Sequence, residues 1–242
     1  MSKSNQKYNG SSQVVQKKQN LAASEQVATG RFFLENSYLR VTVNPQGWIT
    51  VEDKKQRQIY PNLHVFEVTD ISKQIDKSHV PSKKTLSRLI NSLRISLIET
   101  GPKKGAIRIR VRMKVKAELG GGPDQKYPRK RNVKIWTTVC LSSSSHCVEF
   151  KTRVETDPIS RDVNVLLSTG CKTSQLIRQA KQTVQIQDGK RHLILNTTNP
   201  LKAELRLDNH RTLAFCLIPA RKKMIPSKTF AYTLDFSPTT PK

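Results

Sequence analysis

The sequence lacks most of the features that mark enzymes, membrane proteins and secreted domains. Of its 242 residues only 18 are acidic, and aromatic residues make up 6%. No apolar run approaches the roughly 18 to 20 residues that a membrane-spanning helix needs, so we expect no membrane span. The N-terminal stretch MSKSNQKYNGSSQVVQKKQN contains no apolar core, and a cleaved secretory signal is therefore not expected.

Cysteine is also scarce. The four cysteines, Cys140, Cys147, Cys171 and Cys216, match no metal-ligand spacing. Cys140 and Cys147 are placed so that they can face each other across a hairpin, but free buried thiols are the commoner outcome. This usage fits a reducing compartment, and we predict a cytoplasmic location.

No segment matches a catalytic or nucleotide-binding motif. The patterns GxSxG, GxxxxGK[ST] and GxGxxG are missing, and the five histidines are scattered without an HExxH pattern. Neighbouring carboxylates such as Glu52 and Asp53 point to opposite faces of a strand, which makes them a poor acid–base pair. The residues alone therefore predict no catalytic residue, no cofactor site and no metal site in this chain.

Positive charge is what the chain has in excess. It carries 43 lysines and arginines, which give a formal net charge of +25. An imbalance of this size favours polyanionic partners such as nucleic acid. Because the basic residues are spread along the chain, a diffuse field without a specific partner is an equal alternative.

Alternation of polar and apolar residues is the dominant pattern from Arg31 onward. About a dozen short alternating runs are separated by turn residues, and no helical period is sustained. We predict an all-β fold, a large antiparallel β-sandwich over residues 29–242. A smaller C-terminal β subdomain from about residue 185 stays open. Residues 1–28 are rich in Ser, Gln, Asn and Lys and predict a disordered basic leader or linker.

Two local predictions concern turns. The run RFFLENSYLRVTV is expected to continue as a strand into the turn Asn44–Gly47, where Gly47 supplies the positive φ that a tight turn needs. Residues 71–91 are polar and interrupted by Pro81, which predicts a long loop with a short helical turn near residues 85–91.

The run from Ile107 to Lys116 alternates without a break. Its polar face carries Arg108, Arg110, Arg112, Lys114 and Lys116. Same-face side chains of a strand repeat about every 6.6 to 6.8 Å, which roughly matches phosphate spacing along a nucleic-acid strand. A second basic cluster follows at Lys126, Arg129, Lys130 and Arg131. These nine residues are our polyanion-binding candidates. A solvated sheet face is the alternative, since no aromatic residue interleaves with the cations.

One stretch resembles a known family. The segment LENSYLRVTVNPQGWITVEDKKQRQIYPNLHVFE, residues 34–67, resembles the start of the C-terminal β-domain of glycoside hydrolase family 38, the α-mannosidase family. The positions that carry the resemblance are Glu35-Asn36, Tyr38, Arg40-Val41, Val43, Asn44, Gly47, Asp53-Lys54, Tyr60, Asn62-Leu63 and Phe66-Glu67. The segment VEFKTRVETDPISRDVNVLLSTG, residues 148–170, is similar to a later part of that domain. The resemblance covers roughly residues 33 to 230.

The resemblance implies a galactose-mutarotase-like supersandwich and a place in carbohydrate metabolism. In that family the zinc ligands and the aspartate nucleophile lie in a separate N-terminal catalytic domain, so zinc is expected there and not in this chain. The implied role is a non-catalytic β-domain that packs against a catalytic α-mannosidase domain or subunit and shapes the glycan cleft. The family's sugar-lining tyrosine and paired acids are missing here; only Asp70, Pro81 and, by position, Asp162 match. A basic β-rich protein that binds nucleic acid or another polyanion, or a structural protein, is the alternative.

Overall fold

The computed structural model describes eleven segments of the chain. They are residues 26–70, 84–86, 92–116, 130–156, 161–171, 175–179, 182–188, 191–199, 202–206, 212–219 and 227–237. All regular structure in these segments is β-strand, and the two sheets they form are antiparallel. No helix long and apolar enough to cross a membrane occurs among the described residues. The predicted all-β antiparallel sandwich is confirmed.

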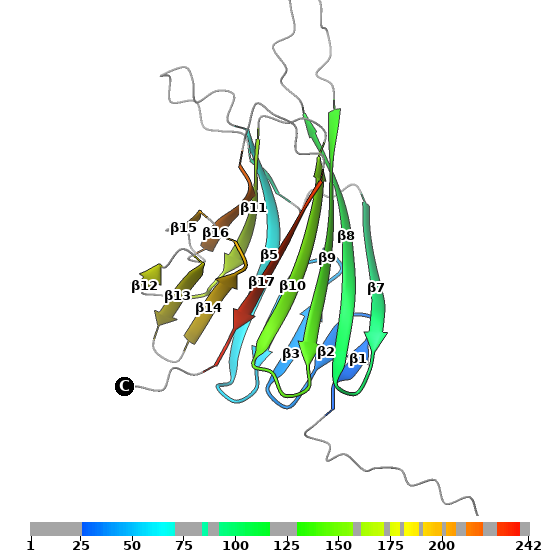
Figure 1. The fold of residues 1–242 in the computed structure, drawn as a ribbon, viewed down its shortest axis with the longest axis vertical. Coiled ribbons are helices and arrows are strands. Elements are labelled where there is room, and N and C mark those ends of the chain that lie inside the picture. The colour runs from blue at the N-terminus through cyan, green and yellow to red at the C-terminus, as the bar shows by residue number, and fades with distance from the viewer. Residues whose placement is uncertain are drawn as a thin grey trace, which may run out of the picture.

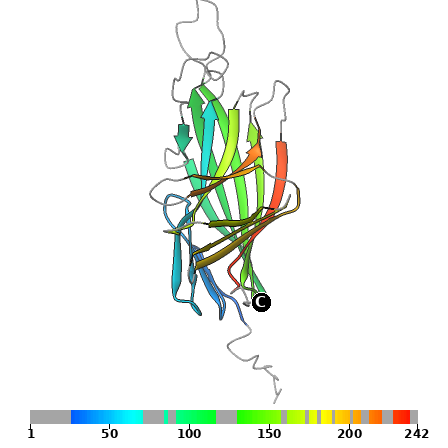
Figure 2. The same ribbon diagram turned by 90° about the vertical axis from the view of Figure 1, so that its left-hand side faces the viewer.

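Two sheets pack against each other (Figure 1). The first sheet consists, in spatial order, of β1 (Ala28–Gly30), β2 (Phe33–Glu35), β3 (Leu39–Val43), β4 (Ile49–Asp53), β5 (Gln58–Asp70), β11 (Arg161–Ser168), β16 (Thr212–Ile218) and β15 (Ala203–Arg206), with β6 (Lys84–Leu86) also on β5. The second consists of β12 (Gln175–Gln179), β13 (Thr183–Asp188), β14 (Arg191–Thr197), β17 (Ser227–Asp235), β10 (Cys147–Thr156), β9 (Lys130–Ser142), β8 (Lys104–Lys116) and β7 (Ser92–Thr100). In Figure 2 the olive strands β13 and β14 cross the direction of the long strands.

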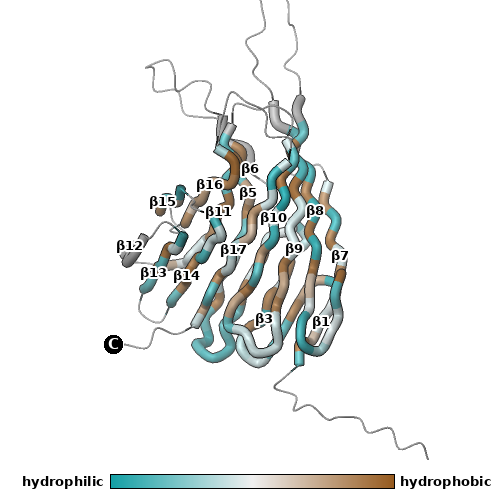
Figure 3. The backbone as a smooth tube through the Cα atoms, viewed as in Figure 1, coloured by the Kyte–Doolittle hydropathy of each residue, from teal (hydrophilic) through white to brown (hydrophobic). Residues whose placement is uncertain are grey.

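The core lies between the two sheets because each strand buries alternate residues. In β8 the apolar side chains of residues 107, 109, 111 and 113 are buried, whereas the cations between them are exposed. Figure 3 shows this alternation as changing colours along β8. From the first sheet, Leu39, Val41 and Val43 of β3 point into the same core. Burial of these apolar side chains is the main stabilising contribution to the fold.

The segment predicted as one continuous strand is divided into β2 and β3 by a turn at Asn36. Its side-chain oxygen accepts hydrogen bonds from the backbone N–H groups of Tyr38, at 2.8 Å, and Leu39, at 2.7 Å. Its side-chain nitrogen donates to the carbonyl oxygens of Ser142, at 2.7 Å, and Ser145, at 2.9 Å, where β9 turns toward β10. The prediction of a single strand was therefore wrong, because Asn36 leaves the ladder to bind the other sheet.

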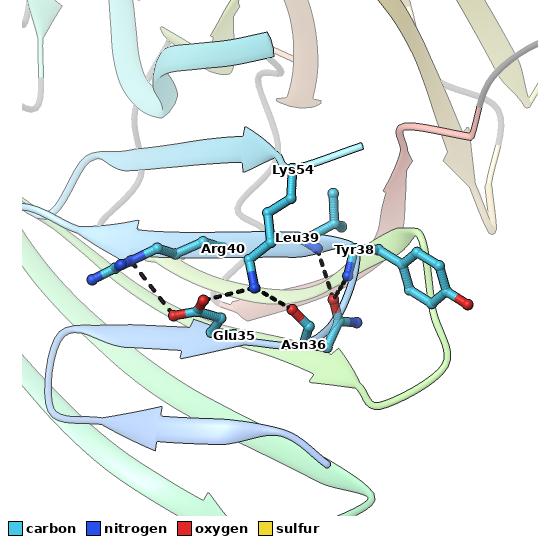
Figure 4. Close-up of polar contacts among 6 residues, drawn as sticks. All are labelled: Glu35, Asn36, Tyr38, Leu39, Arg40 and Lys54. Carbon is cyan, nitrogen blue, oxygen red and sulfur yellow. Dashed lines mark hydrogen bonds and ion pairs between the residues drawn. The ribbon is translucent and has the colours of Figure 1, made fainter. Parts of the chain in front are cut away.

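Charged side chains brace this turn on its solvent side (Figure 4). The ammonium group of Lys54 donates to the carbonyl oxygen of Asn36 and pairs with the Glu35 carboxylate, both at 2.6 Å. Arg40 lies 3.7 Å from the other oxygen of Glu35. One lysine therefore links the end of β4 to the turn between β2 and β3.

The predicted hairpin between β3 and β4 is confirmed. The Asn44 side chain accepts from the backbone N–H groups of Gln46, at 3.0 Å, and Trp48, at 2.9 Å. Gly47 has a φ of 79°. A Cβ atom there would lie 2.8 Å from a methyl carbon of Leu93 in β7, so glycine is needed for space as well as for φ.

Strand β5 is long and irregular. Its pairing shifts register against β4 and against β11, and Asn62 and His64 have positive φ values of 53° and 65°. Such irregularities are β-bulges, which re-aim side chains. They leave His64 buried in the core.

The helical turn predicted near residues 85–91 is not formed at its start. Thr85 and Leu86 belong to β6, which pairs with Val68 and Glu67 of β5. Residues 87–91, like 71–83, lie outside the described residues. A β-branched residue beside an open sheet edge gains backbone hydrogen bonds as a strand, which the local sequence does not reveal.

We expect the substitution Asn36→Ala to destabilise the protein strongly. It leaves the buried N–H group of Leu39, the half-buried N–H group of Tyr38 and two half-buried carbonyl oxygens without their partner, and we expect the free energy of unfolding to fall by about 3 kcal/mol. Urea denaturation followed by circular dichroism measures this. The matched control is Asn199→Ala at an exposed position, which should change stability by less than about 0.5 kcal/mol. Equal stability of the two variants would contradict the role assigned to Asn36.

Candidate functional site

The structure places four of the nine candidate cations on the outer face of β8. Arg108, Arg110, Arg112 and Lys114 are exposed there. Lys116 ends β8, and its backbone pairs with Lys130 of β9, as Val115 pairs with Arg131. The side chains of Lys116, Lys130 and Arg131 are not described, and Lys126 and Arg129 lie outside the described residues.

Neighbouring strands add cations that a search along one strand cannot find. Arg110 stands opposite Arg94 of β7 on one side and Trp136 of β9 on the other, and Trp136 stands opposite Arg153 of β10. Two residues further along β8, Arg112 stands opposite Lys134 of β9. Two residues before Arg110, Arg108 stands opposite Thr138 of β9, which in turn stands opposite Lys151 of β10. We call this surface the basic face; it comprises Arg94, Arg108, Arg110, Arg112, Lys114, Lys134, Trp136, Lys151 and Arg153.

Trp136 lies at the centre of the basic face. The guanidinium carbons of Arg110 and Arg153 each lie 5.7 Å from the centre of its ring. At this distance a guanidinium is attracted to the face of an indole. The ring therefore attracts two arginines, one from each neighbouring strand.

Carboxylates neutralise only one side of the basic face. Glu155 lies 2.6 Å from Arg153 and 3.9 Å from Lys134. At the lower end of β8 Lys104 donates to Glu149 at 2.9 Å, and this hydrogen bond raises the pKa of Lys104. Among the residues described, the remaining cations form no ion pair: Arg94, Arg108, Arg110, Arg112, Lys114 and Lys151.

A pocket of about 510 Å³ adjoins the basic face. Lys151 lines both, and Cys140, Glu149, Asn196 and Thr197 form other parts of the pocket wall. Burial raises the pKa of the Cys140 thiol, which keeps it protonated and makes it a poor nucleophile. The pocket therefore offers hydrogen-bonding groups and one unpaired cation, but no activated catalytic group among these side chains.

All four cysteines are free thiols. Cys140 stands opposite Glu149, so Cys147 is not its direct partner across the hairpin. In the described part of the chain, no three His, Cys, Asp or Glu side chains are grouped so that they could hold a metal ion.

A chain of hydrogen bonds crosses the core between the two sheets. The His64 ring bonds the hydroxyl of Tyr232, which lies 3.1 Å from the Thr152 hydroxyl, itself 3.2 Å from that of Thr137. Burial lowers the pKa of His64 from 6.5 to about 3 and raises that of Tyr232 well above its usual range. Both groups are therefore neutral at physiological pH. Because His64 is only 1% exposed, this network serves the packing of the sheets.

Comparison with known proteins gives matches in structure. No protein-family model matches the sequence, and no curated protein matches it. Its structure matches the crystal structure of an α-mannosidase from Enterococcus faecalis V583, with a TM-score of 0.68 and 18% identity over 85% of this chain. The chain has the fold of one part of an α-mannosidase. It spans 29% of that chain's length.

A second solved structure agrees. It is a protein of glycosyl hydrolase family 38 from Enterococcus faecalis, with a TM-score of 0.66, 18% identity, and coverage of 85% of this chain and 30% of that chain. The resemblance to this family is thus confirmed as a likeness of fold over 85% of the chain.

In this α-mannosidase-like fold, several of the residues on which the sequence resemblance rests have structural roles. Asn36 and Lys54 hold the turn between β2 and β3, and Asn44 and Gly47 shape the hairpin. Asn62 forms part of the bulge in β5. The resemblance therefore marks architecture, and it identifies no catalytic group.

The buried state of His64 predicts a specific loss of stability in mild acid. The unfolded chain takes up a proton at this residue near pH 6.5, whereas the folded chain does so only near pH 3. Stability from this residue is therefore complete above pH 6.5 and falls as the pH is lowered. Between pH 7 and pH 5 we expect a loss of about 2 kcal/mol.

Urea denaturation at several pH values measures this loss, and two variants isolate its source. Asparagine tolerates the positive φ of position 64. The His64→Asn variant should therefore fold with lower overall stability, and its stability should no longer fall between pH 7 and pH 5 through protonation of His64. His146→Asn, at a half-buried position near the surface, should retain it. An unchanged slope in His64→Asn would show that another group titrates.

Proposed function

We propose that the protein is a non-catalytic β-domain that packs against a catalytic α-mannosidase domain or subunit and helps to shape its glycan cleft. The observation that supports this most is the likeness of 85% of the chain to less than a third of a solved α-mannosidase. A chain with the fold of one part of a larger enzyme is expected to work together with the remainder. The proposed setting is carbohydrate metabolism, with a mannose-containing glycan as the ligand of the pair and zinc in the partner.

The described part of the chain has a core of its own. Its large apolar side chains are mostly covered by the facing sheets, and only Phe32, Ile59 and Ile98 among them are exposed. The domain is thus expected to fold when it is separate from its partner, which makes direct reconstitution possible. The four free thiols agree with the reducing, cytoplasmic location that we propose.

Reconstitution tests the proposal. The full chain is mixed with a separately produced catalytic α-mannosidase domain from the same source, and hydrolysis of 4-nitrophenyl α-mannoside is followed with and without a zinc chelator. We expect a stable complex on size-exclusion chromatography and an increase in hydrolysis of about tenfold or more, because positioning of a substrate contributes effects of this size. The increase should disappear with the chelator.

The chain alone should show no turnover, and the destabilised Asn36→Ala variant should give a weaker increase at raised temperature. Separate elution of the two proteins together with unchanged hydrolysis would refute the proposed function.

A further inference from the structure

The basic face arranges cations in a regular grid. Along β8 the side chains of Arg108, Arg110, Arg112 and Lys114 follow one another at alternate positions, which are about 6.7 Å apart in a strand. Across the sheet, adjacent strands are about 4.8 Å apart, and Lys151 and Arg153 of β10 lie two strands away from β8. An extended chain of phosphates laid along β8 would meet a cation at each step.

Like charges stand directly opposite each other in this grid. Arg94 of β7 pairs with Arg110 of β8, and Arg112 of β8 pairs with Lys134 of β9. Cross-strand pairs of like charge destabilise a sheet. A solvated face gains nothing from this arrangement, because interspersed acids would give the same solubility at higher stability. A bound anion would neutralise the repulsion.

The group formed by Arg110, Trp136 and Arg153 adds an aromatic ring and two neighbouring guanidinium groups to the basic face. Aromatic rings and guanidinium planes are the groups on which unpaired bases stack. The indole also orients both guanidinium groups, so less side-chain entropy is lost when they bind a ligand. Trp136 is half-buried, between exposed cations on both neighbouring strands.

From these observations we propose that the basic face binds single-stranded nucleic acid. The phosphates contact Arg108, Arg112, Lys114 and Lys151, and one base stacks on the group centred on Trp136. Double-stranded nucleic acid fits less well, because its bases are read by an element that enters a groove, whereas this surface is the face of a sheet. A sulfated polysaccharide would use the cations but has no aromatic face for Trp136.

Fluorescence anisotropy of labelled oligo(dT) of 20 nucleotides with the full chain tests this. With four phosphates neutralised, the affinity should fall about 50-fold between 50 and 200 mM KCl. The pair of substitutions Arg108→Gln and Arg112→Gln should lower the affinity at least about tenfold at 50 mM KCl and reduce the slope of log K against log salt by about 1.4.

The matched control removes the same charge elsewhere. Lys55 and Lys202 are exposed residues at the β4–β5 turn and before β15, and Lys55→Gln with Lys202→Gln should change the affinity less than about twofold and keep the slope, because neither residue is expected to contact phosphate. Trp136→Leu should weaken binding about tenfold with an unchanged salt slope, because stacking does not release counterions. Thermal melts of each variant show that it is folded.

Three results would overturn the proposal. They are no binding at 50 mM KCl, an equal loss of affinity in the Lys55 and Lys202 control, or full affinity in Trp136→Leu together with equally tight binding of dextran sulfate. The last result would assign the basic face to anionic polysaccharides. None of these measurements needs the catalytic partner, so this proposal and the proposed function can fail independently.

Discussion

The carboxamide of Asn36 ties the two sheets together at the start of the first sheet. It uses both of its ends: the oxygen accepts from two N–H groups of its own turn, and the nitrogen donates to two carbonyl groups of the turn after β9. Aspartate has no donor for the two carbonyls, and glutamine places its amide one carbon further out. Only asparagine satisfies all four groups at this position.

This link sets the position of neighbouring elements. With β2 and β3 fixed beside β9 and β10, the ring of Tyr38 packs on His146, with ring centres 3.8 Å apart. The tip of the following hairpin reaches β7, where Gly47 leaves room for Leu93. Further along the first sheet, the bulge at His64 allows its ring to reach Tyr232 of β17. The sheets are thus joined by polar contacts at both the rim and the centre of an otherwise apolar core.

Strand content and the hairpin could be predicted because they depend on local alternation and on a four-residue turn. Strand β8 occurs where the alternating run from Ile107 to Lys116 predicts it, and Gly47 has the positive φ expected of it. The turn at Asn36 could not be predicted, since its partner Ser142 lies 106 residues away in the sequence. The short strands β6 and β12 contain too few residues for a period to be seen.

The candidate site was predictable only along one strand. The alternation of β8 identifies four exposed cations, but the place of Trp136 between Arg110 and Arg153 depends on the register of three strands. Register is fixed by the turns and by the burial of whole faces, and no local pattern encodes it. Bulges such as the one at Asn62 are equally hidden, because they depend on which residues the partner strands present.

The basic face also affects self-association, because Arg94 lies on β7 beside Arg110 of β8. In the described part of the chain β7 is the last strand of the second sheet, and an open edge of this kind invites another strand to pair with it. A second copy that paired with this edge through its own β7 would bring its Arg94 and Arg110 close to those of the first copy. Repulsion between the guanidinium groups of the two copies opposes edge-to-edge pairing of their sheets. The groups that attract anions to this surface therefore also oppose polymerisation through the sheet edge.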